Sequence, residues 1–108
     1  YASEDMLARK IGEARVEAEA LLAGLQAALA ADGDLLSAEE TTELQRDMTA
    51  LETVMEQNEP DEIRAATEVL GRASEVFAAR RMDRSIQAAL QGVALTDLES
   101  AEAEENIP

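Results

Sequence analysis

Apolar residues at the start of the chain recur at helical spacing. Between residues 6 and 29 they lie alternately four and three positions apart, at Leu7, Ile11, Ala14, Ala18, Leu21, Leu25 and Ala28. This spacing places them on one face of an α-helix, which Leu22 and Leu29 widen. The pattern predicts a long amphipathic helix over about residues 3–31.

Turn and capping signals separate this helix from the next one. Gly33 follows the last apolar residues and suits the left-handed conformation that often ends a helix. Ser37 and Glu40 have the spacing of a capping box. They predict a second, shorter helix over about residues 38–57. Its inner stripe consists of Leu44, Met48, Leu51, Val54 and Met55.

A third helix is predicted over about residues 60–91, with Pro60 at its first position. Its inner stripe starts with Ile63, Thr67, Leu70, Ser74 and Phe77. Beyond Phe77 the apolar spacing slips by about one position, so we expect a kink or a break near residues 78–82. Residues 99–108 are rich in glutamate and predict a solvated acidic tail.

Three helices joined by short loops predict an all-α fold, an antiparallel up-down-up bundle, over residues 1–98. The first helix is much longer than the second. We therefore expect one end of the first helix to project beyond the bundle, unless the second half of the third helix folds back over it.

The composition fits one domain with an aliphatic core. The chain has 108 residues, 46% of them apolar, with a single Phe and a single Tyr. Twenty-four acidic residues against nine basic ones give a net charge of −15, which disfavours nucleic acid and anionic membranes as partners. No apolar run is long enough to cross a membrane. The chain begins with Tyr1, which we interpret as the start of a fragment of a longer protein.

The residues offer little catalytic chemistry. Without His and Cys, the usual general base, the thiol nucleophile and most zinc sites are excluded. The carboxylates of Glu39, Glu40 and Glu43 lie at the polar start of a helix, and we interpret them as a solvated face. The glycines are scattered and form no phosphate loop. We expect no enzyme activity, cofactor or metal site in these residues.

Three of the nine basic residues cluster at Arg80, Arg81 and Arg84. Arg81 lies four residues after Phe77 and extends the inner stripe, so its guanidinium can reach an acidic neighbour and act as a structural clasp. The other interpretation is a patch that binds a partner. A matching alternative for the whole chain is a free-standing acidic helical adaptor that binds a basic protein.

Three stretches resemble the C-terminal helical region of HscA-like chaperones, a bacterial branch of the DnaK-like, seventy-kilodalton heat-shock family. They are YASEDMLARK at 1–10, ALAADGDLLSAEE at 28–40 and FAARRMDRSIQAAL at 77–90, and the resemblance extends to about Leu98. The family combines an ATPase domain that uses ATP and Mg²⁺, a β-sandwich that holds an extended peptide, and a helical lid. The resemblance implies that this chain is the lid, which slows peptide release.

The same resemblance implies the partners. They are the β-sandwich subdomain of the same parent chain, an IscU-type iron–sulfur scaffold as client and an HscB-type co-chaperone, all in the bacterial cytoplasm. In the family an acidic residue of the first lid helix latches onto the β-sandwich, and that position corresponds here to Glu19 or Glu17. Family members commonly carry a His one turn later, where this chain has Ala23, so that part of the latch is missing.

Removal of the β-sandwich would leave apolar positions of the first helix uncovered. Met6, Leu7 and Ile11 are the candidates for this contact surface. We therefore expect the isolated chain to self-associate or to exchange its first helix between copies.

Overall fold

The protein is helical in a computed structural model that describes the backbone of residues 2–105 and the side chains of residues 2–92. The helices are α1 (Ala2–Asp32), the single 3₁₀ turn η1 (Gly33–Leu35), α2 (Ala38–Met55), α3 (Pro60–Ala73) and α4 (Glu75–Glu105). No strand occurs in this described range, which confirms the all-α prediction. The chain divides into two compact units, residues 1–77 and 78–108.

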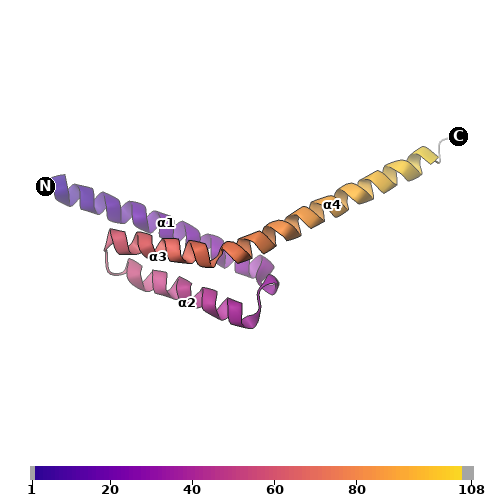
Figure 1. Cartoon of the computed structure of the whole chain (residues 1–108). Helices are drawn as coiled ribbons and strands as arrows, with labels where there is room; N and C mark the ends of the chain where they lie inside the picture. Colours follow the sequence, from indigo (N-terminus) through magenta and orange to yellow (C-terminus); the bar gives the residue numbers. More distant parts are fainter. Residues whose placement is uncertain (1, 106–108) are drawn as a thin grey trace. The chain divides into compact units, whose positions relative to one another are not determined.

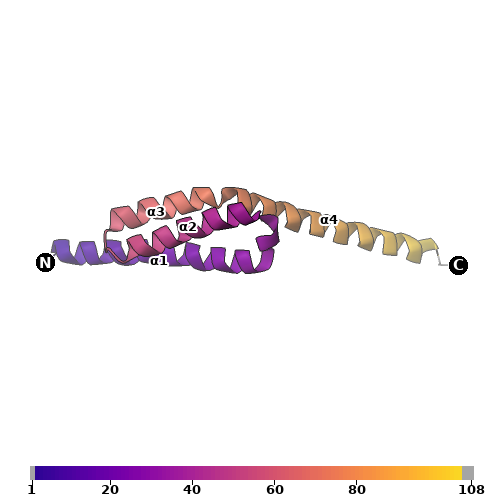
Figure 2. The same ribbon diagram turned by 90° about the horizontal axis from the view of Figure 1, so that it is seen from below.

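The first unit is an antiparallel bundle. Figures 1 and 2 show α1, α2 and α3 side by side, each running opposite to the one before it. Their apolar faces meet in one core, closed at one end by the first turn of α4. The buried core residues are Ala14, Ala18, Leu22, Leu25, Ala28, Leu44, Met48, Leu51, Ile63, Leu70 and Phe77. The predicted stripes therefore form the core, with Leu22 more deeply buried than Leu21.

Two helix starts follow the predicted local chemistry. The Ser37 hydroxyl accepts a hydrogen bond from the Glu40 backbone N–H at 3.1 Å, and the Glu40 carboxylate accepts one from the Ser37 N–H at 2.9 Å. This confirms the capping box, which satisfies backbone donors that the first turn of α2 cannot pair itself. Pro60 lies in the first turn of α3 and is buried.

The end of α1 differs from the prediction. Gly33 does not adopt the left-handed conformation, since no described glycine has a positive φ. It opens η1 instead, and its carbonyl accepts a hydrogen bond from the Leu36 N–H at 3.1 Å. This tighter turn satisfies a backbone carbonyl without a left-handed residue. The left-handed residue in the described chain is Asn58, with φ 58°, just after α2.

The interruption after α3 lies at Ser74, earlier than the predicted 78–82, and α4 is continuous through those positions. The Ser74 hydroxyl donates to the Gly71 carbonyl at 2.9 Å, a local bond that competes with regular helix pairing. α4 also continues past the predicted end near residue 91. The backbone of the predicted tail is helical to Glu105, and the side chains of that tail lie outside the described residues.

One end of α1 projects beyond the bundle, as its length predicts. α1 has 31 residues, whereas α2 has 18 and α3 has 14. Figures 1 and 2 show the N-terminal part of α1 extending past the loop between α2 and α3. Within the part of the chain searched, no helix combines the length and the apolar character that a membrane crossing needs.

Candidate functional site

The most distinctive surface of the bundle is the uncovered N-terminal part of α1, residues 2–13, which we term the projecting segment. Met6 is 57% exposed and Leu7 is 50% exposed, while Ile11 is partly buried. Leu7 and Ile11 continue the face that buries Ala14 and Ala18 farther along the helix. The core stripe of α1 therefore runs on past the point where α2 and α3 cover it.

Arg15 marks the point where α1 leaves the bundle. Its guanidinium Nη2 donates to the Met55 carbonyl at 3.0 Å and to the side-chain oxygen of Asn58. Met55 is the last residue of α2, so the positive charge lies at the negative end of that helix. Arg15 thus ties the end of α2, together with the left-handed Asn58, to α1. We term these three residues the Arg15 clamp.

The apolar spacing and capping signals of the sequence do not reveal the Arg15 clamp. Arg15 lies beside the apolar stripe of α1, and its contacts are 40 and 43 residues away in the chain. The Arg15 Nε atom is buried and has no hydrogen-bond partner. The available signal was Asn58, because asparagine tolerates the left-handed conformation that ends many helices.

A second polar contact joins α1 to α3. The Arg64 guanidinium on α3 is 3.8 Å from the Glu13 carboxylate on α1. Both side chains are about half exposed, at 46% and 61%. Exposed pairs of this kind contribute about 0–1 kcal/mol. This pair therefore helps to orient α1 against α3 without contributing much to stability.

The two candidate latch residues lie on different sides of α1. Glu17 and Glu19 are two positions apart, and residues so spaced do not share a helix face. Glu19 borders a surface hollow of about 300 Å³ together with Arg15 and Met55. Glu17 borders a different hollow with Gly12 and Val16. The structure does not bring the two carboxylates together, so one docking partner cannot contact both in the same way.

The predicted clasp residues differ in burial. Phe77 is a core residue of the first unit, with 2% of its surface exposed. In the second unit Arg80 and Arg81 are partly buried, while Arg84 is exposed. The clasp itself stays a prediction, and so does self-association through Met6 and Leu7.

The described residues form no group of three or more His, Cys, Asp or Glu side chains that could hold a metal ion. The carboxylates are spread along the helices. The first unit therefore offers surfaces for docking, and on the projecting segment two large apolar side chains, Met6 and Leu7, are about half exposed.

Comparisons with known proteins place these surfaces in context. The family model described as Hsp70 protein matches residues 1–83. The chain is 47% identical over 97 residues to a chaperone protein HscA homolog from Burkholderia multivorans, an alignment that covers 90% of this chain and 16% of that relative. It is 45% identical over 97 residues to a chaperone protein HscA homolog from Ralstonia pickettii, with the same coverage of both chains.

A third relative gives the same picture. The chaperone protein HscA homolog from Methylobacillus flagellatus is 46% identical over 99 residues, which cover 91% of this chain and 16% of the relative. The chain thus spans about one sixth of the length of the curated relatives that it matches.

Proposed function

Because the chain belongs to the Hsp70 family, we propose that it is the helical lid of an HscA-like chaperone. In this role it closes over a peptide held by a β-sandwich subdomain of the same parent chain and slows the release of that peptide. ATP hydrolysis, with its Mg²⁺, belongs to another part of the parent. The 108 residues contribute a cover and no catalytic group.

The observation that carries the proposal is the projecting segment. A helix that has left its own bundle normally turns a polar face to water. This segment keeps the apolar stripe of the core at Leu7 and Ile11, and the side chains of Met6 and Leu7 are about half exposed. An exposed apolar surface of this kind is typical of a docking site. The lid role supplies the missing cover, since the β-sandwich and its peptide would lie beneath the segment.

The size of the effect follows from the exposed area. Full burial of a Met or Leu side chain contributes about 1.5–3 kcal/mol. Since about half of Met6 and Leu7 is still exposed, closing the lid gains roughly 2–3 kcal/mol from the two together. If release requires an open lid, that gain slows dissociation by about 30- to 150-fold.

The test uses the full-length parent chaperone and a fluorescent client peptide, with dissociation measured after addition of unlabelled competitor. The double variant Met6→Ser/Leu7→Ser should release peptide at least about tenfold faster than the wild type. Met82→Ser/Leu90→Ser is the matched control, since it removes the same two residue types at exposed sites of α4. Unchanged release from the projecting-segment variant, or from a chaperone lacking residues 1–98, would refute the lid role.

The latch is a separate part of the proposal. Glu19 and Glu17 lie on different sides of α1, so only one of them can face the β-sandwich. We expect one of the single variants Glu19→Gln and Glu17→Gln to speed peptide release and the other to leave it unchanged. Equal effects of both variants would count against a specific latch at either position.

The biological client is proposed from the relatives, which are named chaperone protein HscA homologs. We propose that the parent protein works in the bacterial cytoplasm in iron–sulfur cluster assembly, with an IscU-type scaffold as client and an HscB-type co-chaperone. Dissociation of such a scaffold from the parent should show the same dependence on Met6 and Leu7. If the scaffold does not bind the parent, the assignment of this client is wrong. The lid role itself is still tested by the release of the fluorescent peptide.

A further inference from the structure

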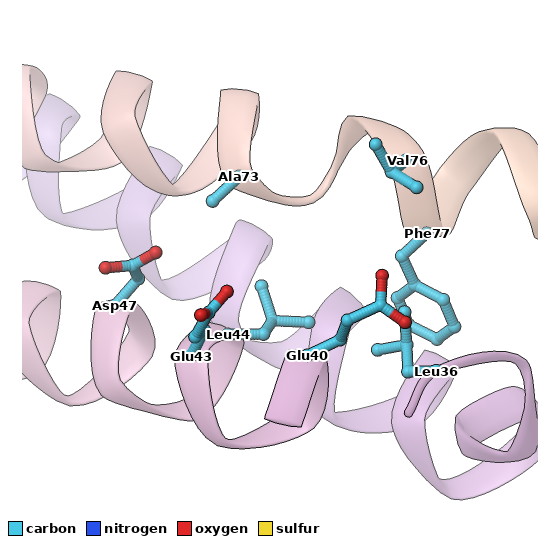
Figure 3. Close-up of a pocket in the computed structure, with 8 residues that line it drawn as sticks. All are labelled: Leu36, Glu40, Glu43, Leu44, Asp47, Ala73, Val76 and Phe77. Atoms are coloured by element: carbon cyan, nitrogen blue, oxygen red, sulfur yellow. The ribbon is translucent and has the colours of Figure 1, made fainter. Parts of the chain in front are cut away.

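A hollow of about 250 Å³ lies on the first unit between α2 and the segment that joins α3 to α4. Figure 3 shows Ala73 and Val76 on one side of it, Glu43 and Asp47 on the other, and Leu44 and Phe77 between them. We term it the α2–α3 hollow. None of its lining residues comes from α1, so it is separate from the projecting segment.

One wall of the α2–α3 hollow is apolar and open to solvent. Val76 is 55% exposed, and Ala73 next to it is also exposed. Val69, one turn before Ala73 on α3, is 56% exposed and continues this wall. Beneath the wall, Leu44 and Phe77 belong to the buried core. A side chain that enters the hollow would therefore meet apolar surface on its side and floor.

The opposite wall carries two carboxylates. Glu43 and Asp47 are four residues apart on α2 and share one face, and Figure 3 shows both reaching toward the ribbon that carries Ala73. Among the described residues neither carboxylate has a hydrogen-bond or ion-pair partner. Glu40, one turn earlier, is held instead by the Ser37 capping box. Like charges at this spacing repel one another, and a bound cation would relieve the repulsion.

We propose that the α2–α3 hollow docks a basic amphipathic helix of a partner protein. Its apolar side lies against Val69, Ala73 and Val76, and Lys or Arg side chains on its adjacent side pair with Glu43 and Asp47. Helices recognised in grooves present residues at this three- or four-residue spacing. The volume accommodates one large apolar side chain, which is less than a drug-sized ligand needs. The net charge of −15 attracts such a partner over longer distances.

This inference does not rest on the lid function. The projecting segment contacts the parent's own chain in that function, whereas the α2–α3 hollow is made by Leu36, α2, α3 and the first turn of α4. The Met6→Ser/Leu7→Ser variant should therefore bind the basic helix as well as the wild type. A variant that loses binding of the basic helix should still slow peptide release, and the reverse holds for a variant of the projecting segment. The two proposals can therefore be refuted independently.

The probe is a synthetic 14-residue peptide with Leu on one helical face and Lys on the adjacent face, carrying a fluorescent label. Binding to the 108-residue chain is measured by fluorescence anisotropy at low salt. Glu43→Gln/Asp47→Asn should weaken binding about tenfold, equivalent to about 1.4 kcal/mol. The matched control is Glu4→Gln/Asp5→Asn, which removes the same two charges from the exposed first turn of α1 and should change affinity less than twofold.

A second variant distinguishes direct apolar contact with the peptide from attraction by the net charge of the chain. Val76→Ser removes exposed apolar surface without altering the net charge, and it should weaken binding about fivefold with circular dichroism unchanged. Amide shifts on adding the peptide should centre on Glu43, Asp47 and Val76.

Three results would overturn the proposal. Equal losses in the two charge variants would mean attraction by net charge only, and shifts centred on Met6 and Leu7 would place the peptide elsewhere. Self-association of the chain that disappears in Glu43→Gln/Asp47→Asn would make a second copy the occupant.

Discussion

Replacing Arg15 with Met should destabilise the first unit more than any other single change of an exposed or half-buried charge. Methionine keeps much of the aliphatic stem and removes the guanidinium. The change breaks the hydrogen bonds to the Met55 carbonyl and to Asn58. It also removes the positive charge from the C-terminal end of α2.

The magnitude follows from these contacts. A hydrogen bond from a charged donor contributes about 1.5–3 kcal/mol, and the charge at the helix end adds about 0.3–1 kcal/mol. The buried Arg15 Nε without a partner offsets part of this gain, by about 1–3 kcal/mol for a typical unpaired group. We take about 2 kcal/mol as the net loss in Arg15→Met. For a unit of this size that lowers Tm by about 8–16 °C.

The assay is urea unfolding followed by circular dichroism, with thermal unfolding beside it. Arg15→Lys keeps the charge and loses the forked donor geometry, so we expect about half of the loss. Asn58→Gly keeps the left-handed backbone and removes the side-chain acceptor, and a double-mutant cycle with Arg15→Met should give a coupling of at least about 0.5 kcal/mol.

The control for the Arg15 clamp is Arg9→Met, a change of the same type in the projecting segment. It should alter stability by less than about 0.5 kcal/mol, as is usual for a surface substitution. An Arg15→Met variant as stable as Arg9→Met, or a cycle without coupling, would refute the Arg15 clamp.

Three further changes test other parts of the bundle. Ser37→Ala removes the capping box with Glu40 and should cost about 1 kcal/mol in urea unfolding; an unchanged midpoint would contradict the role of the cap. Gly24→Ala should stabilise by about 0.5–1 kcal/mol, because the added methyl group meets no neighbour within 4 Å, and a lower Tm would contradict this. Arg81→Ala should lower Tm more than Arg84→Ala, since Arg81 is the more buried; equal small shifts would favour a partner-binding patch over a clasp.

The helices could be predicted from the sequence because their signals are local. The four-three spacing of apolar residues fixes which face of α1 is buried from Ala14 onward. Ser37 and Pro60 mark two helix starts through contacts within one turn. The projection of α1 follows from comparing predicted lengths. Each of these signals acts over a few residues, so it can be read without knowing where the other helices lie.

The position of the interruption at Ser74 could not be predicted accurately from the local pattern. The slip in apolar spacing becomes visible only when the next apolar residues are reached, near Ala78 and Met82, so the predicted position comes too late. The bond from the Ser74 hydroxyl to the Gly71 carbonyl marks the interruption itself. A serine inside a helical stripe often bonds to its own helix without interrupting it, so sequence alone gives no reason to choose Ser74.

The sequence by itself determined the helical class, the apolar faces, the start of α2 and the surplus length of α1. Only the tertiary structure decided which side chains lie together on the surface of the bundle. Arg15 meets the end of α2 across 40 residues of chain, Glu17 and Glu19 open onto different hollows, and Glu43 faces Ala73 across the α2–α3 hollow. Periodicity specifies which face of a helix is buried. It does not specify the axial position of one helix relative to its neighbour, and that position decides which polar side chains come into contact.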